Sequence, residues 1–274
     1  MTNKRGNANL IKLVIANLIN RDEEECISME AKCRAGPGAK KRLTPLRAGE
    51  SEMAKTSRQY KELSIKEFTR AASKYESDST GVYKLCRHDY PDILEEIEKE
   101  DFQTLLDAGC GTAPMLSLLS EKYPDRLYTG IDLTPTMIEA ARAKHLPNAE
   151  FVIGDCEDLP FADNSFNVII CSQSMHHYPN PQAFFNGAFR CLKAGGRLIL
   201  REFTSDNRLI QWFIARVEMP LLNLAGYGDV KMYTPNEIKE MCRLAGFSVE
   251  KLEKRKRMRL HCVARKPGRS SPAE

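Results

Sequence analysis

Five short apolar runs lie along the middle of the chain, and each ends at a glycine, an acidic residue or another polar residue. Most of them are followed by a segment in which apolar residues recur with helical spacing. Strands that alternate with helices in this way are typical of a parallel sheet with helical crossovers, in which ligands bind where the strands end. The pattern therefore predicts an α/β fold. The five runs are Phe102–Leu106, Leu127–Asp132, Glu150–Asp155, Phe166–Cys171 and Gly196–Glu202.

Helical patterns flank these runs on both sides. Ser64 and Glu67 have the spacing of a capping box, which predicts the start of a helix. A second helical pattern runs from Tyr83 to Glu98 and is interrupted by Pro91. After the five runs, residues 207–227 are strongly apolar. The remaining elements predicted toward the C-terminus are a helix over Thr234–Ala245 and two strands, Phe247–Lys251 and Met258–Ala264.

Length and charge predict one large domain with flanking segments. A chain of 274 residues can bury one full core. The net charge is +4, and all of this excess lies in residues 1–56, which also contain a stretch rich in Pro, Gly, Lys and Arg. We therefore expect 1–56 to be a weakly ordered extension, 57–267 the domain, with lid helices at 64–98 and an insertion at 204–232, and 268–274 a disordered tail. Because the domain itself is neutral, its charge does not favour binding to nucleic acid.

The cysteines indicate a reducing compartment. There are nine, an odd number, without a Cys-x-x-Cys pair, and Cys171, Cys191 and Cys262 lie inside apolar runs. This usage is typical of buried, reduced thiols rather than of disulfides or a zinc site, so we expect a cytoplasmic protein. The apolar segment Leu10–Ile19 is too short to span a bilayer, so we expect no stable insertion into a membrane.

The first run leads into a glycine loop, Asp-Ala-Gly-Cys-Gly-Thr-Ala-Pro at residues 107–114. Gly109 and Gly111 allow a sharp turn and a close approach of the backbone to a ligand. The helical pattern that follows would aim its N-terminal N–H groups at the same ligand. Asp132 ends the second run, where a carboxylate can accept hydrogen bonds from both hydroxyls of a ribose. Together these features indicate a nucleoside-containing cofactor.

With Gly154-Asp155-Cys156 and Leu192-Lys-Ala-Gly-Gly196, these motifs make the chain resemble the class I S-adenosylmethionine-dependent methyltransferases, close to the ubiquinone/menaquinone C-methyltransferase-like group. The resemblance covers roughly residues 64–266. It implies a Rossmann-like, doubly wound sheet of seven strands in the order 3-2-1-4-5-7-6, with the last strand antiparallel. It also implies an enzyme that transfers a methyl group from S-adenosyl-L-methionine to a carbon, oxygen or nitrogen atom of a small-molecule acceptor.

The resemblance implies a set of cofactor contacts at the ends of the strands, together with an aromatic residue of the first lid helix. For that aromatic residue, Tyr75, simple packing within the lid is an equal alternative. The family loop usually has a third glycine where this chain has Ala113 followed by Pro114. Alanine is small and proline suits the first turn of a helix, so binding is still expected. The implied contacts are Tyr75, Asp107, Gly109, Cys110, Gly111, Asp132, Leu133, Asp155, Cys156 and Ser172.

Two other functions are compatible with parts of this pattern. An NAD-dependent oxidoreductase uses the same architecture, but its fingerprint needs a small residue where Pro114 stands and does not need an acid at Asp107. A non-catalytic subunit that binds S-adenosylmethionine is the second alternative, because the motifs report cofactor binding rather than methyl transfer.

His176 and His177, just after the fourth run, are the candidate catalytic residues. A sulfonium methyl group is already activated, so the protein mainly holds the acceptor in line and excludes water. A base is needed only for an acceptor of high pKa, and histidine suits that role, with Tyr178 or Glu202 assisting. The alternative is that adjacent histidines point in opposite directions and only cap the next helix. No Asp, Glu or Cys lies beside them at ligand spacing, so the sequence predicts no metal site.

The apolar residues 207–227 predict the nature of the acceptor. An insertion at this point commonly shapes the acceptor pocket in the family that the chain resembles, and the alternative is a pair of helices that pack in the core. A pocket lined in this way suits a partly apolar small molecule. The fourth run also lacks the Asn-Pro-Pro-Tyr type of motif of methyltransferases that act on nucleic-acid amino groups. The sequence indicates neither the acceptor's identity nor the oligomeric state.

Overall fold

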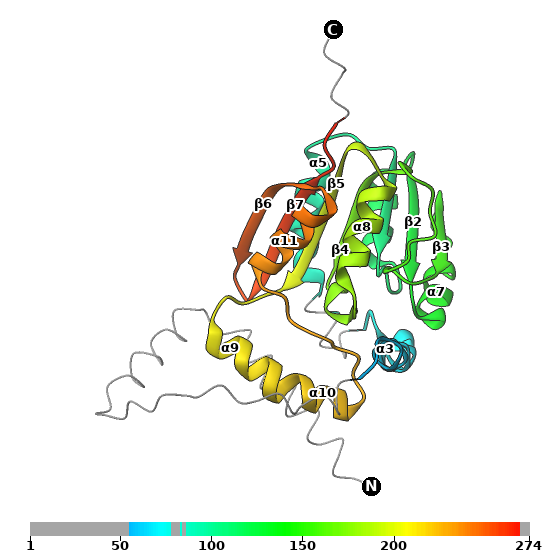
Figure 1. Cartoon of the computed structure of the whole chain (residues 1–274). Coiled ribbons are helices and arrows are strands. Elements are labelled where there is room, and N and C mark those ends of the chain that lie inside the picture. The colour runs from blue at the N-terminus through cyan, green and yellow to red at the C-terminus, as the bar shows by residue number, and fades with distance from the viewer. Residues whose placement is uncertain (1–54, 78–82, 84–85, 269–274) are drawn as a thin grey trace, which may run out of the picture.

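The computed structural model describes residues 55–77, 83 and 86–268, and the seven strands of this part form one sheet in the order β3-β2-β1-β4-β5-β7-β6 (Figure 1). β7 pairs antiparallel with both β5 and β6, while β1 to β5 pair in parallel. The sheet order and the antiparallel last strand implied by the resemblance are therefore confirmed. The strands are β1 (Thr104–Ala108), β2 (Leu127–Asp132), β3 (Ala149–Ile153), β4 (Phe166–Ser172), β5 (Leu192–Phe203), β6 (Ser248–Arg255) and β7 (Arg259–Arg265).

Helices cover both faces of the sheet and bury a hydrophobic core on each (Figure 1). On one face, α5 (Tyr90–Glu98), α6 (Pro114–Lys122) and α7 (Pro135–Arg142) contribute fully buried leucine and isoleucine side chains. On the other face, α8 (Pro181–Cys191) and α11 (Pro235–Ala245) contribute residues such as Phe184 and Ile238. Each such side chain stabilises the fold by about 1.5–3 kcal/mol, so the sheet is a rigid support for whatever lies at its edges.

Two further helical segments lie beyond the edge of the sheet where the parallel strands end (Figure 1). The first is α3 (Ser57–Ala71), which continues into the 3-10 turn η1 (Ala72–Lys74). The second is the predicted insertion, which consists of α9 (Arg208–Phe213), the π-helical turn η4 (Ile214–Glu218) and α10 (Met219–Ala225). These segments therefore lie on the side where ligands bind in open α/β sheets.

Two predicted helix boundaries are wrong, and the physical reasons are local. α3 begins at Ser57 rather than near Ser64, because Thr56 and Gln59 form the capping box. Ser64 instead lies buried inside the helix, where its hydroxyl donates to the carbonyl of Gly228 at 3.4 Å.

Pro91 lies in the first turn of a helix instead of interrupting one. A 3-10 turn, η2 (Arg87–Asp89), precedes it, and the proline occupies the first turn of α5, where its missing N–H has no partner to lose. α5 then packs against the sheet, with Ile93 and Ile97 buried in the core, so it is not a lid helix.

The predicted extension 1–56 lies outside the described residues except for Lys55 and Thr56, and the predicted tail 268–274 does so except for Gly268. The seven cysteines in the described part are buried and free, as the sequence predicts for Cys171, Cys191 and Cys262. None of the helices within the described ranges is long and apolar enough to cross a membrane.

Candidate active site

The loop between β1 and α6 is shaped by three residues in the left-handed region, Gly109 (φ +80°), Gly111 (φ +54°) and Ala113 (φ +59°). A Cβ atom at Gly109 would lie 2.5 Å from the Cβ of Ser174, so only glycine fits there. The backbone N–H groups of Gly109 and Cys110 both donate to the carbonyl of Ile131, at 2.8 and 3.0 Å. The loop is thus fixed against the end of β2.

Asp132 connects this loop to the next helix. Its Oδ2 accepts a hydrogen bond from the backbone N–H of Gly111 at 3.0 Å, and its Oδ1 accepts one from the N–H of Thr134 at 2.8 Å. Burial raises the pKa of Asp132, although these backbone donors oppose the shift. The side chain of Thr134 is a third hydrogen-bond partner of this carboxylate. The two carboxylate oxygens have about four lone pairs together, so Asp132 retains capacity to accept a hydrogen bond from a ligand.

Asp107, at the end of β1, is only 4% exposed. Burial, together with the nearby charge of Asp132, raises the pKa of Asp107 to about 7. Asp107 therefore retains its proton to a much higher pH than a solvated carboxyl group does. It lies near Asp132, at the end of the neighbouring strand.

Tyr75 lies over the glycine loop. Its Cε1 atom is 3.7 Å from the position of a Cβ at Gly111, and its hydroxyl donates to the Sγ of Cys86 at 4.0 Å. The ring also lies 5.9 Å from that of Tyr83, measured between centroids. The structure therefore brings the predicted lid aromatic to the predicted cofactor loop.

The other predicted contacts lie at the ends of β3 and β4 or next to β2. Leu133 is half-buried and Cys156 is buried. The hydroxyl of Ser172 is buried and has no hydrogen-bond partner among the described residues. Asp155 is already paired, because Lys61 of α3 reaches its Oδ2 at 2.5 Å and also contacts Glu157. Sequence reasoning missed Lys61, which lies far from Asp155 along the chain.

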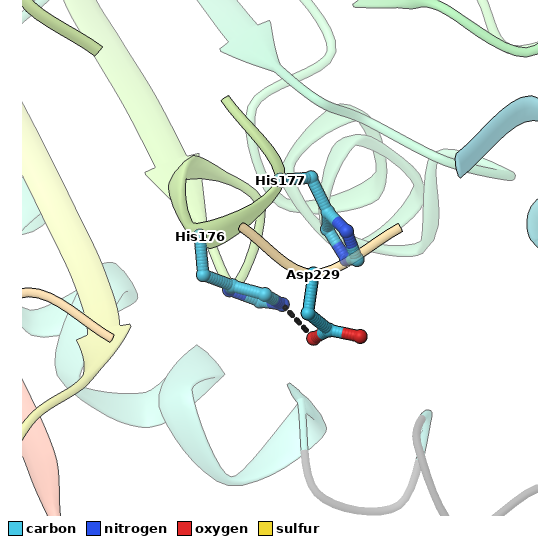
Figure 2. A group of neighbouring side chains, drawn as sticks. All are labelled: His176, His177 and Asp229. Carbon is cyan, nitrogen blue, oxygen red and sulfur yellow. Dashed lines mark ion pairs between the residues drawn. The ribbon is translucent and has the colours of Figure 1, made fainter. Parts of the chain in front are cut away.

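The two histidines lie in a 3-10 turn, η3 (Met175–His177), and both rings turn toward Asp229 (Figure 2). Their ring centroids are 4.2 Å apart. The expected alternative, with the two rings pointing in opposite directions, is wrong, because successive side chains of a 3-10 turn are only about 120° apart and both rings can lean toward Asp229. The ring of His177 also packs edge-on against Phe68 of α3, at 5.1 Å between centroids.

Carboxylates hold the ring of His176 on two sides. Its Nδ1 lies 2.7 Å from Oε1 of Glu202, which is fully buried, and its Nε2 lies 3.7 Å from Oδ1 of Asp229. Glu202 therefore contacts and orients His176, and its assistance in catalysis stays a prediction. Tyr178 does not contact His176 in this way, since its hydroxyl bonds to Ser174 at 2.9 Å and belongs to the buried core.

The two rings differ in basicity. Burial lowers the pKa of His176, but the charge and hydrogen bond of Glu202 outweigh it and raise that pKa to about 9. Burial, with the neighbouring charge of His176, lowers the pKa of His177 to about 4. Near neutral pH, the arrangement therefore holds a proton on His176 and leaves His177 neutral.

The structure corrects the argument against a metal site. That argument depended on the lack of a carboxylate near the histidines, but Asp229 comes from the connection between α10 and α11. The connection is held in place by a hydrogen bond from the N–H of Val230 to the carbonyl of His176 at 2.9 Å. No local sequence signal could have shown this proximity, because it depends on how the insertion folds back.

Known proteins resemble this chain both in sequence and in fold. Residues 106–200 match the family described as a methyltransferase domain. The ubiquinone/menaquinone biosynthesis C-methyltransferase UbiE of Cereibacter sphaeroides is 31% identical over 208 residues, which cover 67% of this chain and 82% of that protein. The phthiotriol/phenolphthiotriol dimycocerosates methyltransferase of Mycobacterium leprae is 36% identical over 109 residues, 39% of this chain; the chain thus spans only 40% of that relative's length.

A solved structure shares the fold. The 1,6-didemethyltoxoflavin-N1-methyltransferase of Burkholderia thailandensis, with bound 1,6-didemethyltoxoflavin and S-adenosylhomocysteine, aligns with a TM-score of 0.59 at 18% identity. The alignment covers 81% of this chain and 94% of that one. At this identity the likeness supports the architecture rather than the substrate.

Proposed function

Because the chain belongs to the class I S-adenosylmethionine-dependent methyltransferases, in their ubiquinone/menaquinone C-methyltransferase-like group, we propose that it methylates a small, partly apolar acceptor that carries an ionisable hydroxyl or enol. The chain is an enzyme of this family and its cofactor is S-adenosylmethionine, so the family replaces both the NAD-dependent and the non-catalytic alternatives. The observation that carries the proposal is that the glycine loop, α3 and the end of the insertion all contact the segment 174–178, which carries His176 and His177.

The residues at the strand ends fit this cofactor. We assign the ribose to the carboxylate of Asp132 and the close approach of the amino-acid end to Gly109–Gly111. The buried, unpartnered hydroxyl of Ser172 is a further polar group for the cofactor to satisfy. The remaining proposed contacts are Tyr75, Asp107, Cys110, Leu133, Asp155 and Cys156.

The insertion supports an apolar acceptor. Leu209, Trp212 and Leu224 of α9 and α10 are 64%, 61% and 80% exposed, an unusual amount of apolar surface on one helical segment. The names of the relatives refer to ubiquinone, menaquinone and dimycocerosates, and each of these contains long apolar parts. We therefore place the acceptor against this side of the site. The buried, free cysteines of the described part support a cytoplasmic location, because reduced thiols are typical of a reducing compartment.

When bound, S-adenosylmethionine supplies a methyl group on a positively charged sulfur, which is already a good electrophile. The tasks left to the chain are to orient the acceptor, to exclude water and to remove its proton. Phe68 covers the histidine pair from α3. His176 is oriented by Glu202, and His177 keeps one ring nitrogen, Nδ1, without a hydrogen-bond partner in the described structure. We assign the acceptor's proton to His177, because His176 already holds a proton near neutral pH.

A transfer assay tests the proposal. S-adenosylmethionine with a labelled methyl group is incubated with the full chain and with either the lipid or the aqueous fraction of a cell extract. We expect label in the lipid fraction, and its loss in Asp132→Ala, which should weaken cofactor binding by about 1–3 kcal/mol in calorimetry. The exposed acid Asp158, changed to Ala, is the matched control. Label only in the aqueous fraction would contradict the apolar acceptor.

A further inference from the structure

The geometry points to a divalent transition-metal site formed by His176, His177 and Asp229 (Figure 2). Each of the three residues offers one ligand atom, and these atoms all lie within 4.8 Å of one another. The Nε2 of His176 and the Oδ1 of Asp229, joined by the dashed line, are 3.7 Å apart. In the part of the chain that the structure describes, this is the one group of three or more such residues close enough to share an ion.

Glu202 supplies a contact that is typical of metal sites in proteins, a carboxylate beside the metal-binding histidine. A histidine that binds a metal almost always donates its other ring N–H to a carboxylate or carbonyl, which fixes the tautomer and the ring orientation. The Nδ1 of His176 makes this contact with Glu202 at 2.7 Å, and the backbone N–H of His176 donates to the same carboxylate at 3.2 Å. The Nε2 atom is therefore the one directed at the proposed ion.

His177 provides the second, independent observation. Its Nδ1 is buried and has no hydrogen-bond partner among the residues described. A buried polar atom without a partner is uncommon in native structures, and it often marks a position where an ion or a water molecule binds. A metal ion bound between the two rings would give the Nδ1 of His177 the partner that it lacks among the described residues.

The chemistry of the ligands selects the class of metal. Imidazole nitrogen suits zinc and its neighbours in the first transition row, whereas Mg²⁺ and Ca²⁺ prefer sites made only of oxygen atoms. Zinc with three protein ligands keeps an open position, which is the arrangement of catalytic rather than structural sites. Zinc–nitrogen and zinc–oxygen distances of about 2.0–2.2 Å require the three side chains to move closer together. We therefore commit to Zn²⁺ as the probe.

The same contacts have a metal-free interpretation, in which a protonated His176 bridges Glu202 and Asp229. The two differ in what His177 does, since the bridge does not involve it, whereas the metal site needs its ring nitrogen. Substitution of His177 therefore separates them.

The role of the ion rests on the proposed function. With the ion bound, the metal takes over the part proposed above for the ring of His177. An acceptor hydroxyl at the open position would release its proton to solvent more readily, because the ion stabilises the negative oxygen. That oxygen would then form the new bond to the methyl carbon, while the bond between carbon and sulfur breaks and its electron pair remains on sulfur. The products are the methylated acceptor and S-adenosylhomocysteine.

Equilibrium dialysis of the full chain against Zn²⁺, followed by measurement of protein-bound zinc, tests the site. We expect about one zinc ion per chain, lost in Asp229→Ala and in His177→Ala, and unchanged in His145→Asn, which replaces an exposed histidine elsewhere. Glu202→Gln should weaken zinc binding about tenfold or more. Binding of S-adenosylhomocysteine by each variant confirms that it is folded.

Two results would overturn the inference: no zinc above the amount in Asp229→Ala, or zinc that His177→Ala retains at full stoichiometry. The proposed function is tested separately, by measuring the rate of methyl transfer after a chelator has removed the zinc. If zinc binds as expected but no lipid-fraction acceptor is methylated, the metal site stands and the acceptor proposal fails. If transfer continues at the full rate without zinc, the catalytic role of the ion fails and the acceptor proposal stands.

Discussion

Lys61 of α3 reaches the carboxylate of Asp155, at the end of β3, with 2.5 Å between its Nζ and Oδ2. The same ammonium group contacts Glu157, and these interactions raise the pKa of Lys61 against the opposing effect of burial. α3 also carries Phe68, which packs on His177, and leads into Tyr75, which lies over Gly111. One helix therefore contacts both the cofactor side and the histidine side of the site.

We expect Lys61→Met to weaken binding of S-adenosylmethionine by about two- to fivefold, because a partly exposed ion pair contributes at most about 1 kcal/mol. The effect should shrink at high ionic strength, where the pair is already screened. Calorimetry at low and high salt measures both. Lys66→Met, an exposed lysine on the same helix, is the control. Equal weakening in both variants would show that the pair does not hold the helix over the cofactor.

Gly109→Ala should abolish cofactor binding and lower the melting temperature. A methyl group there would meet the side chain of Ser174, and φ is +80°. Gly195→Ala is a matched control, because Gly195 has a φ of +79° but no atom lies within 4 Å of its added Cβ. Both variants carry the backbone strain of about 1–2 kcal/mol, so the difference between them measures the clash.

Ser174→Gly in the Gly109→Ala background should restore part of the lost stability, since it removes the atoms that collide. If the single variants Gly109→Ala and Gly195→Ala melt at the same temperature, the close approach at the loop is not what requires glycine.

Asp107 should make the stability of the cofactor-free protein depend on pH. Burial raises its pKa to about 7, whereas the unfolded chain has the ordinary value near 3.8. Between these values the folded protein holds a proton that the unfolded chain has lost, so stability falls as pH rises from about 4 to 7. The titratable groups around it are Asp132, Tyr90, Cys110 and Cys171.

The asparagine of the variant Asp107→Asn cannot ionise, so the stability of this variant should not fall in this way as pH rises. We expect the variant to gain stability relative to the unchanged protein as pH rises from 5 to 8, by on the order of a few kcal/mol. Thermal melts across this range measure the difference, with the exposed Asp125→Asn as the control. A difference that stays constant with pH would mean that Asp107 titrates normally.

Local patterns in the sequence were sufficient for the strands and for the position of the glycine loop, whereas the order of the strands came from the resemblance to a known family. Gly109, Gly111 and Asp132 lie within or next to strands whose apolar runs are plain in the chain, and the parallel order brings their ends together. The helix boundaries were less predictable, since Ser64–Glu67 and Thr56–Gln59 both have capping-box spacing and only the second is used.

The contacts of Lys61 and Asp229 could not be predicted in the same way. Each comes from a segment beyond the sheet, α3 or the connection after α10, and meets a residue far away along the chain. Their positions depend on how these segments pack on the edge of the sheet, and no periodicity within either segment encodes that packing. Lys61 and Asp229 therefore required the structure, whereas His176, His177 and Glu202 are named from the sequence.

His177→Gln should lower the rate of methyl transfer by about 10²- to 10⁴-fold while leaving cofactor affinity within about twofold. The physical reason is that the cofactor contacts come from other strand ends, whereas His177 faces the proposed acceptor side with an unpartnered Nδ1. His176→Gln should produce a loss of similar size, since its ring is held by Glu202 and Asp229 beside that of His177. Single-turnover rates with saturating cofactor measure methyl transfer, and calorimetry measures cofactor affinity.

The control variant His145→Asn should leave both the rate of methyl transfer and the cofactor affinity unchanged. If both glutamine variants transfer methyl groups at nearly the full rate, orientation alone drives the reaction and the histidine pair has no part in removing the acceptor's proton.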